Sequence, residues 1–452
     1  MTPIIGRLVG FFGRDLLGLV WAVELVLILW PNVLLKDVLL GAFAIFLVVA
    51  LARATRRSQI TVAVLVVAGY ALFPAEGGFA ALLDGLRMSV VFAAFLPTMF
   101  LARATADHNP EIERSRSAFA AMAGPNRNAG FLFGSHAIGA IVTAGAFAVM
   151  SAILPREASP EERRRAALAA LRGMNIAVLW SPFFVAMAVA SHHVPGVPLW
   201  HTALLGVPLA ATGLAIGFFA FSGASGGRAA LIESLRALTP SLPLLLIAGC
   251  SIVLVGAVTS LSSLQAVLLT VPPLCLIDIV RRGRRGVLAV ALPIAAATRA
   301  SLGRINDDLV LLTGAVLFGR VLEANPGVTG MLAQLAGFGL PVVALLAGAM
   351  AFMLIAAVAG VHPVVTMTLV LVTLGGEASR LAPVVLLELG LYGWALGTMV
   401  SMSSVSIAVA AAMFRVPVPR LAFAENLRYV LMFGAVSSLL LALANRALVG
   451  AF

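Results

Sequence analysis

Long apolar runs recur along the whole chain, separated by short polar stretches. Runs such as 244–261, 264–280 and 431–449 are each about twenty residues long, enough for a helix to cross about 30 Å of hydrocarbon. We therefore predict an all-α polytopic membrane protein with about eleven spanning helices, near 15–31, 36–54, 58–75, 85–103, 166–192, 198–221, 241–261, 263–281, 304–323, 382–413 and 427–449. The more polar segment 104–121 and the segment 286–300 are predicted to be interfacial helices.

Two further apolar stretches, 122–155 and 341–375, are interrupted at their centres. The interruptions are Gly134-Ser135-His136 in the first and Gly360-Val361-His362-Pro363 in the second. Non-helical backbone at membrane depth is tolerated only where protein or a water-filled cavity covers it. We therefore predict two re-entrant hairpins, each with a histidine at its tip.

Composition excludes a water-soluble protein and gives a topology. Hydrophobic residues make up 61% of the chain and charged residues 11%, and the mean hydropathy is +1.07, far from the values of soluble domains. The net charge of +11 would suggest nucleic-acid binding in a soluble protein, but here the arginines fall in short loops. They place the chain in the cytoplasmic membrane with its N-terminus inside. The loops predicted inside hold Arg53, Arg56, Arg57, Arg114, Arg116, Arg127, Arg163, Arg164, Arg165, Arg172, Arg228, Arg236, Arg281, Arg282, Arg284, Arg285, Arg415 and Arg420.

An internal repeat relates the two halves of the chain. The run 133–138 (FGSHAI) resembles 359–364 (AGVHPV), and 180–185 (WSPFFV) aligns with 400–405 (VSMSSV). Each half keeps the same order of spanning helix, hairpin and long helix with a polar break. Five spans per repeat is an odd number, so the second copy must be inverted, as in many secondary transporters.

The repeat sets the predicted domain boundaries. Residues 1–35 form an N-terminal helix. The first repeat, 36–221, comprises scaffold helices 36–103, hairpin 122–155 and broken helix 166–192. A cytoplasmic linker, 222–240, leads to the second repeat, 241–449, which comprises scaffold helices 241–281, hairpin 341–375 and broken helix 382–413.

The run 311–323 (LLTGAVLFGRVLE), followed by 327–333 (GVTGMLA), resembles the segment before the second hairpin in the ion transporter superfamily. That group includes divalent anion/sodium symporters and arsenite-efflux type permeases. The order of elements is similar from about 36 to 449. The resemblance implies a homodimer built on scaffold helices, with a mobile transport domain that moves as an elevator. The symporters carry Ser-Asn-Thr at each tip, whereas this chain has Ser135-His136-Ala137 and Val361-His362-Pro363, so their dicarboxylate specificity does not carry over.

Polar residues at the tips and breaks are the candidate site. His136 and His362 could donate hydrogen bonds to an anion or carry protons. The hydroxyls of Ser135 and Thr366 could bind ligand or bond back to their own helices. At the breaks, Ser403 and Ser404 are assigned to the solute, and a cation or the break itself is assigned Asn175, Ser181, Pro182, Thr398 and Ser401. The solute is expected midway across the membrane, among these four places.

Few other groups offer chemistry. Cys250 and Cys275 are expected to be core thiols, and His192, His193 and His201 are expected on an outer loop. Glu388 is an intramembrane carboxylate away from the tips. No P-loop, HExxH, CxxC or GxSxG context occurs in the sequence, so ATP-driven transport and hydrolysis have little support.

The sequence therefore favours a secondary transporter, not an enzyme, that moves a small anionic solute in the lipid bilayer. We expect no cofactor beyond a coupling Na⁺ or H⁺ and no nucleic-acid partner. The homodimer is expected to form through the helices near 58–75 and 241–281. Two alternatives remain: a cation/proton antiporter of the same fold, which Glu388 keeps open, and a membrane-embedded enzyme that uses His136 and His362.

Overall fold

The computed structural model describes residues 15–73, 77–122, 126–155, 157–221, 227–284, 286–327, 330, 339–376, 379–402 and 404–450. Within these ranges the chain is helical, and no β-strand occurs among them. Two compact units share the chain. One comprises Met1–Thr105 with Val255–Phe338, and the other comprises Ala106–Leu254 with Gly339–Phe452.

Helices of the described residues agree with a multi-pass membrane protein. Six are long and apolar enough to cross a membrane, and a seventh span results if the bent pair α12 (Gly227–Leu238) and α13 (Leu242–Val258) is counted as one. The predicted number of about eleven spans stays a prediction. Large apolar side chains such as Val48, Ile60 and Val67 are mostly exposed, as expected for surfaces that face lipid rather than water.

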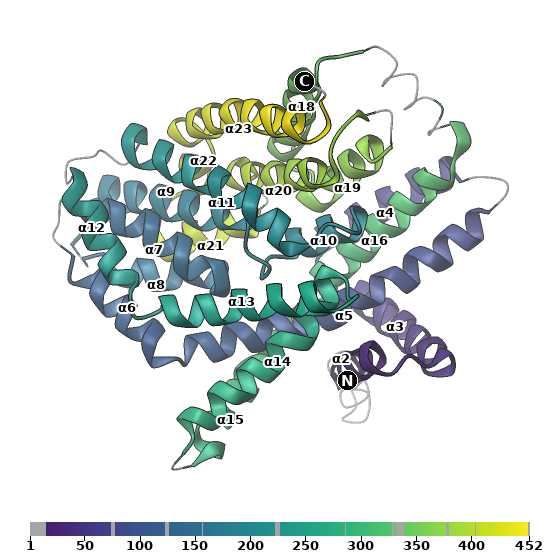
Figure 1. The fold of residues 1–452 in the computed structure, drawn as a ribbon, viewed down its shortest axis with the longest axis horizontal. Helices are drawn as coiled ribbons and strands as arrows, with labels where there is room; N and C mark the ends of the chain where they lie inside the picture. Colours follow the sequence, from purple (N-terminus) through teal and green to yellow (C-terminus); the bar gives the residue numbers. More distant parts are fainter. Residues whose placement is uncertain are drawn as a thin grey trace. The chain divides into compact units, whose positions relative to one another are not determined.

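Among the residues that the structure describes, six helices and most of a seventh belong to the first unit, and they come from both halves of the sequence (Figure 1). Asn32 caps α3, Thr55 caps α4, and a capping box of Ser262 and Gln265 begins α14, each satisfying N–H groups that the first helical turn leaves unpaired. The Trp21 indole donates to Thr98 Oγ1 at 2.9 Å and ties α2 to α5. The helices are α2 (Leu16–Leu29), α3 (Val33–Arg53), α4 (Arg56–Ala71), most of α5 (Gly78–Asp107), α14 (Ser263–Arg282), α15 (Val287–Leu302) and α16 (Asn306–Ala324).

The second unit contains both predicted hairpin segments and both predicted broken helices. Its helices are α6 (Pro110–Ala120), α7 (Arg127–Val142), α8 (Gly145–Ile153), α9 (Pro160–Ile176), the 3₁₀-helix η3 (Ala177–Leu179), α10 (Val185–His193), α11 (Leu199–Ile216), the π-helix η4 (Gly217–Phe221), α12 (Gly227–Leu238), most of α13 (Leu242–Val258), α18 (Val342–Val358), α19 (Pro363–Leu374), α20 (Pro383–Val400), α21 (Val405–Phe414), α22 (Val418–Ala422) and α23 (Glu425–Val449).

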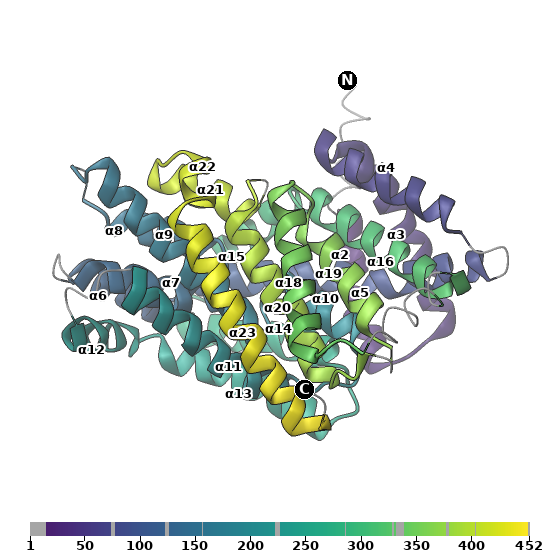
Figure 2. The ribbon, with the colours of Figure 1, turned by 90° about the horizontal axis from the view of Figure 1, so that it is seen from above.

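Helix α20 forms the centre of the second unit. It packs against α9, η3, α10 and α11 from the first half of the chain and against α18, α19 and α23 from the second. Figure 2 shows α18, α20 and α23 side by side. Fifteen of the eighteen residues of α20 are buried, Tyr392 and Glu388 among them, so polar groups on this helix must find partners inside the protein.

Three details of the sequence interpretation are wrong. The segment 104–121 is not one helix, because α5 continues to Asp107 and a new helix, capped by Asn109 with Pro110 at its first position, begins there. Pro lacks the N–H that a continuing helix would need. Cys250 is exposed, not a core thiol, whereas Cys275 is buried. Arg172 does not lie in a loop, since it is buried in α9.

Candidate functional site

The first hairpin segment turns at Thr143-Ala144, between α7 and α8. Thr143 has a positive φ of 52°, an uncommon conformation for a residue other than glycine. The predicted tip at Gly134-Ser135-His136 is therefore wrong, because these residues lie inside α7. A Cβ on Gly134 would come within 3.1 Å of Phe119 and 3.2 Å of Met150. This small residue serves close packing rather than a break in the helix.

His136 is held by two hydrogen bonds in this unit. Its Nδ1 lies 3.1 Å from the Gly173 carbonyl oxygen, and the Trp180 indole Nε1 donates to its Nε2 at 3.2 Å. A carbonyl oxygen can only accept, so the proton is assigned to Nδ1 and Nε2 is the acceptor. Both ring nitrogens are engaged in this conformation. Ser135 beside it is buried and donates to the Leu132 carbonyl at 3.1 Å.

The second hairpin segment turns between α18 and α19, at the predicted Gly360-Val361-His362 sequence. Gly360 has a φ of +91°, which glycine adopts without steric cost. His362 caps α19, since its Nδ1 accepts from the Val364 N–H at 3.2 Å, and Pro363 occupies the first helical position. The neutral His362 ring therefore carries its proton on Nε2, and it lies 6.0 Å from the Trp394 ring centroid. Thr366 donates to the Pro363 carbonyl.

The first broken helix ends its α-helical part at Ile176 and resumes at Val185. Between them Ser181 is fully buried, donates to the Ala140 carbonyl of α7 and accepts from the Phe183 N–H at 3.2 Å. Pro182 is half-buried in the same break. One hydroxyl thus ties the break to the first hairpin segment and satisfies backbone that the missing helical bonds would otherwise leave unpaired.

The second broken helix is interrupted between α20 and α21. Ser404 donates to the Thr398 carbonyl at 2.7 Å and caps α21 by accepting from the Ile407 N–H. Ser401 is buried at the end of α20. The predicted site residue Ser403 lies outside the described residues. The break is therefore stabilised from within by its own serine.

One bond joins the two broken helices directly. The Thr398 hydroxyl of α20 donates to Asn175 Oδ1 of α9 at 2.8 Å, and both side chains are buried. The amide nitrogen of Asn175 donates to the Leu171 carbonyl at 2.8 Å. The structure thus brings together Asn175, Thr398 and Ser404 in one chain of hydrogen bonds. His136 of α7 and Ser181 of the first break each form a hydrogen bond that links α7 to that break.

Several polar residues escaped the sequence interpretation. Trp180 and Trp394 each lie beside one of the two histidines. His193 is not on an outer loop, because it is the last residue of α10, where its Nε2 lies 3.2 Å from Thr368 Oγ1 of α19. His201 is not on an outer loop either, because it lies in the first turn of α11, where its ring is edge-on to the Trp200 ring. Of these residues, only Trp180 could have been found from the sequence, because it directly precedes Ser181 of the predicted break.

Glu388 is a buried carboxyl group of the second unit. Its residue is 0% exposed, and neither carboxyl oxygen has a hydrogen-bond partner among the residues that the structure describes. A Cβ placed on Gly206 of α11 would overlap the Leu179 carbonyl oxygen of η3 and come within 3.0 Å of Glu388 Oε1. The missing side chain at Gly206 therefore lets α11 approach both η3 and the carboxyl group.

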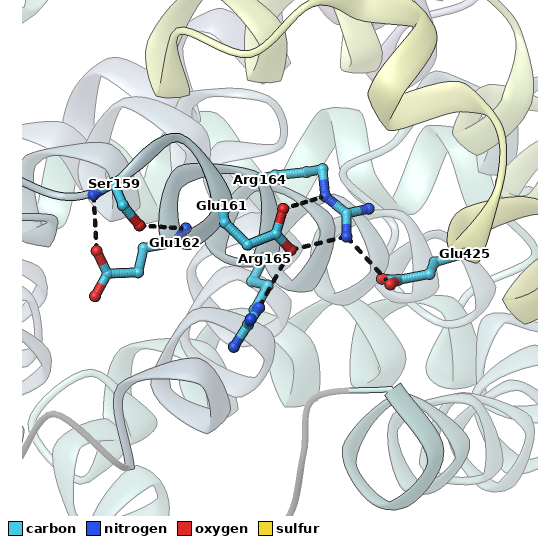
Figure 3. A network of polar contacts seen from close by, with 6 residues as sticks. All are labelled: Ser159, Glu161, Glu162, Arg164, Arg165 and Glu425. Atoms are coloured by element: carbon cyan, nitrogen blue, oxygen red, sulfur yellow. Dashed lines mark hydrogen bonds and ion pairs between the residues drawn. The ribbon is translucent and has the colours of Figure 1, made fainter.

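Charged groups anchor the start of α9 (Figure 3). Ser159 and Glu162 form a capping box, and Arg164 pairs with Glu161 at 2.9 Å and with Glu425 of α23 at 3.1 Å. The hydrogen bond from Arg164 is the main cause that lowers the pKa of Glu161, and the bonds from Ser159 lower the pKa of Glu162. The positive end of the helix dipole also stabilises both carboxylates.

Arg172 lies two turns further along α9 and is 2% exposed. Its guanidinium is placed over the rings of Phe221, at 4.7 Å, and Tyr429, at 4.9 Å, and its Nε donates to Asn426 Oδ1 at 3.2 Å. The amide of Asn426 donates in turn to the Met399 carbonyl of α20. Cation–π contacts compensate part of the hydration that a buried guanidinium loses.

No protein-family model and no curated protein matches the chain. Among solved structures, the YdaH transporter of Alcanivorax borkumensis is similar over 87% of this chain and 96% of its own, at 15% sequence identity and a TM-score of 0.47. Among the described residues, no group of three or more His, Cys, Asp or Glu side chains is arranged to hold a metal ion.

Proposed function

We propose that this protein is a secondary active transporter that moves a small anionic solute across the cytoplasmic membrane. An elevator-type movement of the hairpins and broken helices, coupled to a sodium or proton gradient, carries the solute. The observation that carries the proposal is that both hairpin segments and both broken helices gather in one compact unit. The Thr398–Asn175 bond, which links the two broken helices directly, adds support.

The chemistry of the breaks suits an anion. Helices α10, α19 and α21 all begin at an interruption, and a helix N-terminus presents unpaired N–H groups and the positive end of a dipole. In the second repeat, the Nε2 proton assigned to His362 adds a donor at the start of α19. Helices broken at membrane depth require a cover of protein or a water-filled cavity, and a cavity between two repeats is where secondary transporters bind their solutes.

Uptake into proteoliposomes tests the proposal. A thermal-shift screen of carboxylates, phosphate and sulfate, with and without sodium, comes first, because a ligand that binds the folded state raises its apparent stability. The anions that stabilise the protein are then offered to proteoliposomes with an imposed sodium or proton gradient. Gradient-dependent accumulation supports transport. Chemical conversion of the anion without accumulation would support the enzyme alternative and contradict the proposal.

A matched pair of threonine variants locates the site. Thr398→Val removes the bond between the broken helices and should lower the initial uptake rate about tenfold, because losing a buried hydrogen bond costs about 1–3 kcal/mol. Thr212→Val is the control, since that exposed hydroxyl of α11 donates only to the Pro208 carbonyl of its own helix. Equal uptake rates for the two variants would place the solute elsewhere.

The second candidate function is a cation/proton antiporter of the same fold. One observation favours it, the buried and unpartnered carboxyl group of Glu388. An antiporter acidifies or alkalinises the vesicle interior when Na⁺ or K⁺ is added, without any organic solute. A pH-sensitive dye enclosed in the proteoliposomes therefore separates it from a symporter, which moves protons only when its anion is present.

A further inference from the structure

We propose that the coupling ion is a proton and that Glu388 carries it. This inference rests on the proposed transport function and names the residue and the ion that drive it. The Glu388 carboxyl group lies inside the second unit on the central helix α20 and is fully buried.

An ionised carboxylate cannot remain at this position unaided. Burying a charge without a hydrogen bond or an opposite charge is far less favourable than burying the neutral acid. Within the described part of the second unit, neither oxygen of Glu388 has a hydrogen-bond partner. In the conformation described here the group is therefore the neutral acid, with a proton on one oxygen.

The helices packed against α20 give the Glu388 carboxyl group no hydrogen bond. They are α9, η3, α10, α11, α18, α19, α21, α22 and α23, and none of their titratable groups is hydrogen-bonded to Glu388. These groups, with Tyr392 of α20 itself, are Glu161, Glu162, Arg163, Arg164, Arg165, Arg172, His192, His193, His201, Arg420, Glu425, Arg428, Tyr429 and Arg446.

The surroundings of the carboxyl group connect it to the first broken helix. The Leu179 carbonyl oxygen and Glu388 Oε1 both lie within 3.0 Å of the point where a Cβ on Gly206 would stand. Leu179 ends η3, directly before the break that holds Trp180 and Ser181. A rearrangement of this break therefore changes the contacts of Glu388, and the absence of a side chain at Gly206 keeps the place open.

These contacts define a proton step. When the break opens to water, the O–H bond of the acid breaks, the proton passes to a water molecule, and the carboxylate stays behind with its charge hydrated. The charged form cannot return to the closed conformation until it takes up a proton again. Protonation on one side and release on the other thus link each cycle of the hairpins to one proton.

Infrared spectroscopy of the purified protein in lipid tests the protonation directly and needs no solute. At neutral pH the wild type should show the carbonyl stretch of a protonated carboxylic acid, and Glu388→Gln should lose it. Glu24→Gln is the matched control, because Glu24 is a half-buried carboxyl in the apolar helix α2 of the other unit. An unchanged band in Glu388→Gln overturns the inference, whether or not the protein transports anything.

Transport assays then test the coupling. Glutamine has the shape of the protonated acid, so Glu388→Gln should fold with an unchanged melting temperature and bind the anion that stabilised the wild type in the screen. It should exchange this anion across the membrane but lose at least tenfold in accumulation driven by a proton gradient. Accumulation equal to the wild type overturns the inference. A wild type that shows the infrared band but transports no anion contradicts the proposed function alone.

Discussion

The two hairpin segments differ in how each holds its histidine and its neighbours. In the first, His136 lies in the middle of α7 with both ring nitrogens bonded. In the second, His362 stands at the break itself and caps α19. The sequence pairs these residues, yet one fixes Trp180 at a helix break and the other starts a helix. Similar residues at repeat-related positions therefore need not perform similar tasks.

The helix next to each hairpin segment also packs differently: α9 packs against α7 in the first region, and α20 packs against α18 in the second. In the first, a Cβ on Gly173 of α9 would overlap the Leu132 carbonyl oxygen of α7, so backbone faces backbone. In the second, a Cβ on Gly393 of α20 would overlap only the thioether of Met353 on α18. Methionine has three flexible bonds and adapts to its surroundings. The first region is consequently the more rigid contact.

The largest expected effect comes from adding a methyl group to each contact. Gly173→Ala should destabilise the protein by more than about 3 kcal/mol, at the upper end of overpacking costs, because neither backbone segment can yield. Gly393→Ala should cost about 1 kcal/mol, since the Met353 side chain can move aside. Thermal unfolding in detergent measures both. Equal losses would show that the two contacts are equally adaptable.

Removing the two histidines should separate their roles. His136→Ala leaves the Trp180 indole N–H and the Gly173 carbonyl unpaired and should cost about 2–4 kcal/mol of stability. His362→Ala removes one helix cap and should cost about 1 kcal/mol, while reducing transport through the lost Nε2 donor. Melting temperature and uptake are measured together for both variants. A His362→Ala variant that loses more stability than His136→Ala would reverse the assignment.

The smallest expected effect on stability concerns the N-termini of α9 and α20. Helix α9 is anchored by charges, whereas the start of α20 is held by a neutral amide, since Asn445 Oδ1 accepts from the Ala382 N–H at 2.8 Å. The pKa of Glu161 is held below its ordinary value of 4.5. Its contribution to the stability of the folded protein is therefore present above pH 4.5 and is lost as the pH falls through the lowered pKa. Because Glu161 is half exposed, this contribution is only a few tenths of a kcal/mol.

Changes of pH and of salt concentration reveal the contribution of Glu161 to stability. Glu161→Gln should lower the melting temperature by about 1 °C at pH 7, and the difference from the wild type should shrink as the pH falls through the lowered pKa of Glu161. High salt should diminish the difference at pH 7, because exposed ion pairs are screened. A difference between wild type and variant that does not change with pH would mean that the side chain acts through packing.

Sequence periodicity predicted helices better than it predicted what interrupts them. A run of apolar residues is enough to indicate a helix such as α3, predicted over 36–54 and found at Val33–Arg53. Gly134-Ser135-His136 interrupts an apolar stretch, and this pattern predicts the tip of a hairpin. In the folded protein the same residues pack α7 closely and bond within their own surroundings, which depends on neighbours distant in the chain.

The candidate site was predicted only where its partners are close in sequence. Ser404 caps the helix that directly follows it, a local pattern that a sequence can reveal. The isolation of Glu388 and the burial of Arg172 depend on helices from the other half of the chain. Whether a polar side chain finds a partner is decided by the packing of distant segments, and no local pattern records it.

The partner of Arg172 also sets a timing for synthesis. Arg172 and Asn426 are 254 residues apart in the chain. At about 5–20 residues per second, the ribosome needs about 13–50 s to reach the second residue after the first. During that interval the guanidinium has neither Asn426 nor the Tyr429 ring, so burial of α9 in its final form must wait for α23. A nascent chain arrested between the two should therefore keep the start of α9 open to proteases or chaperones until the last helix arrives.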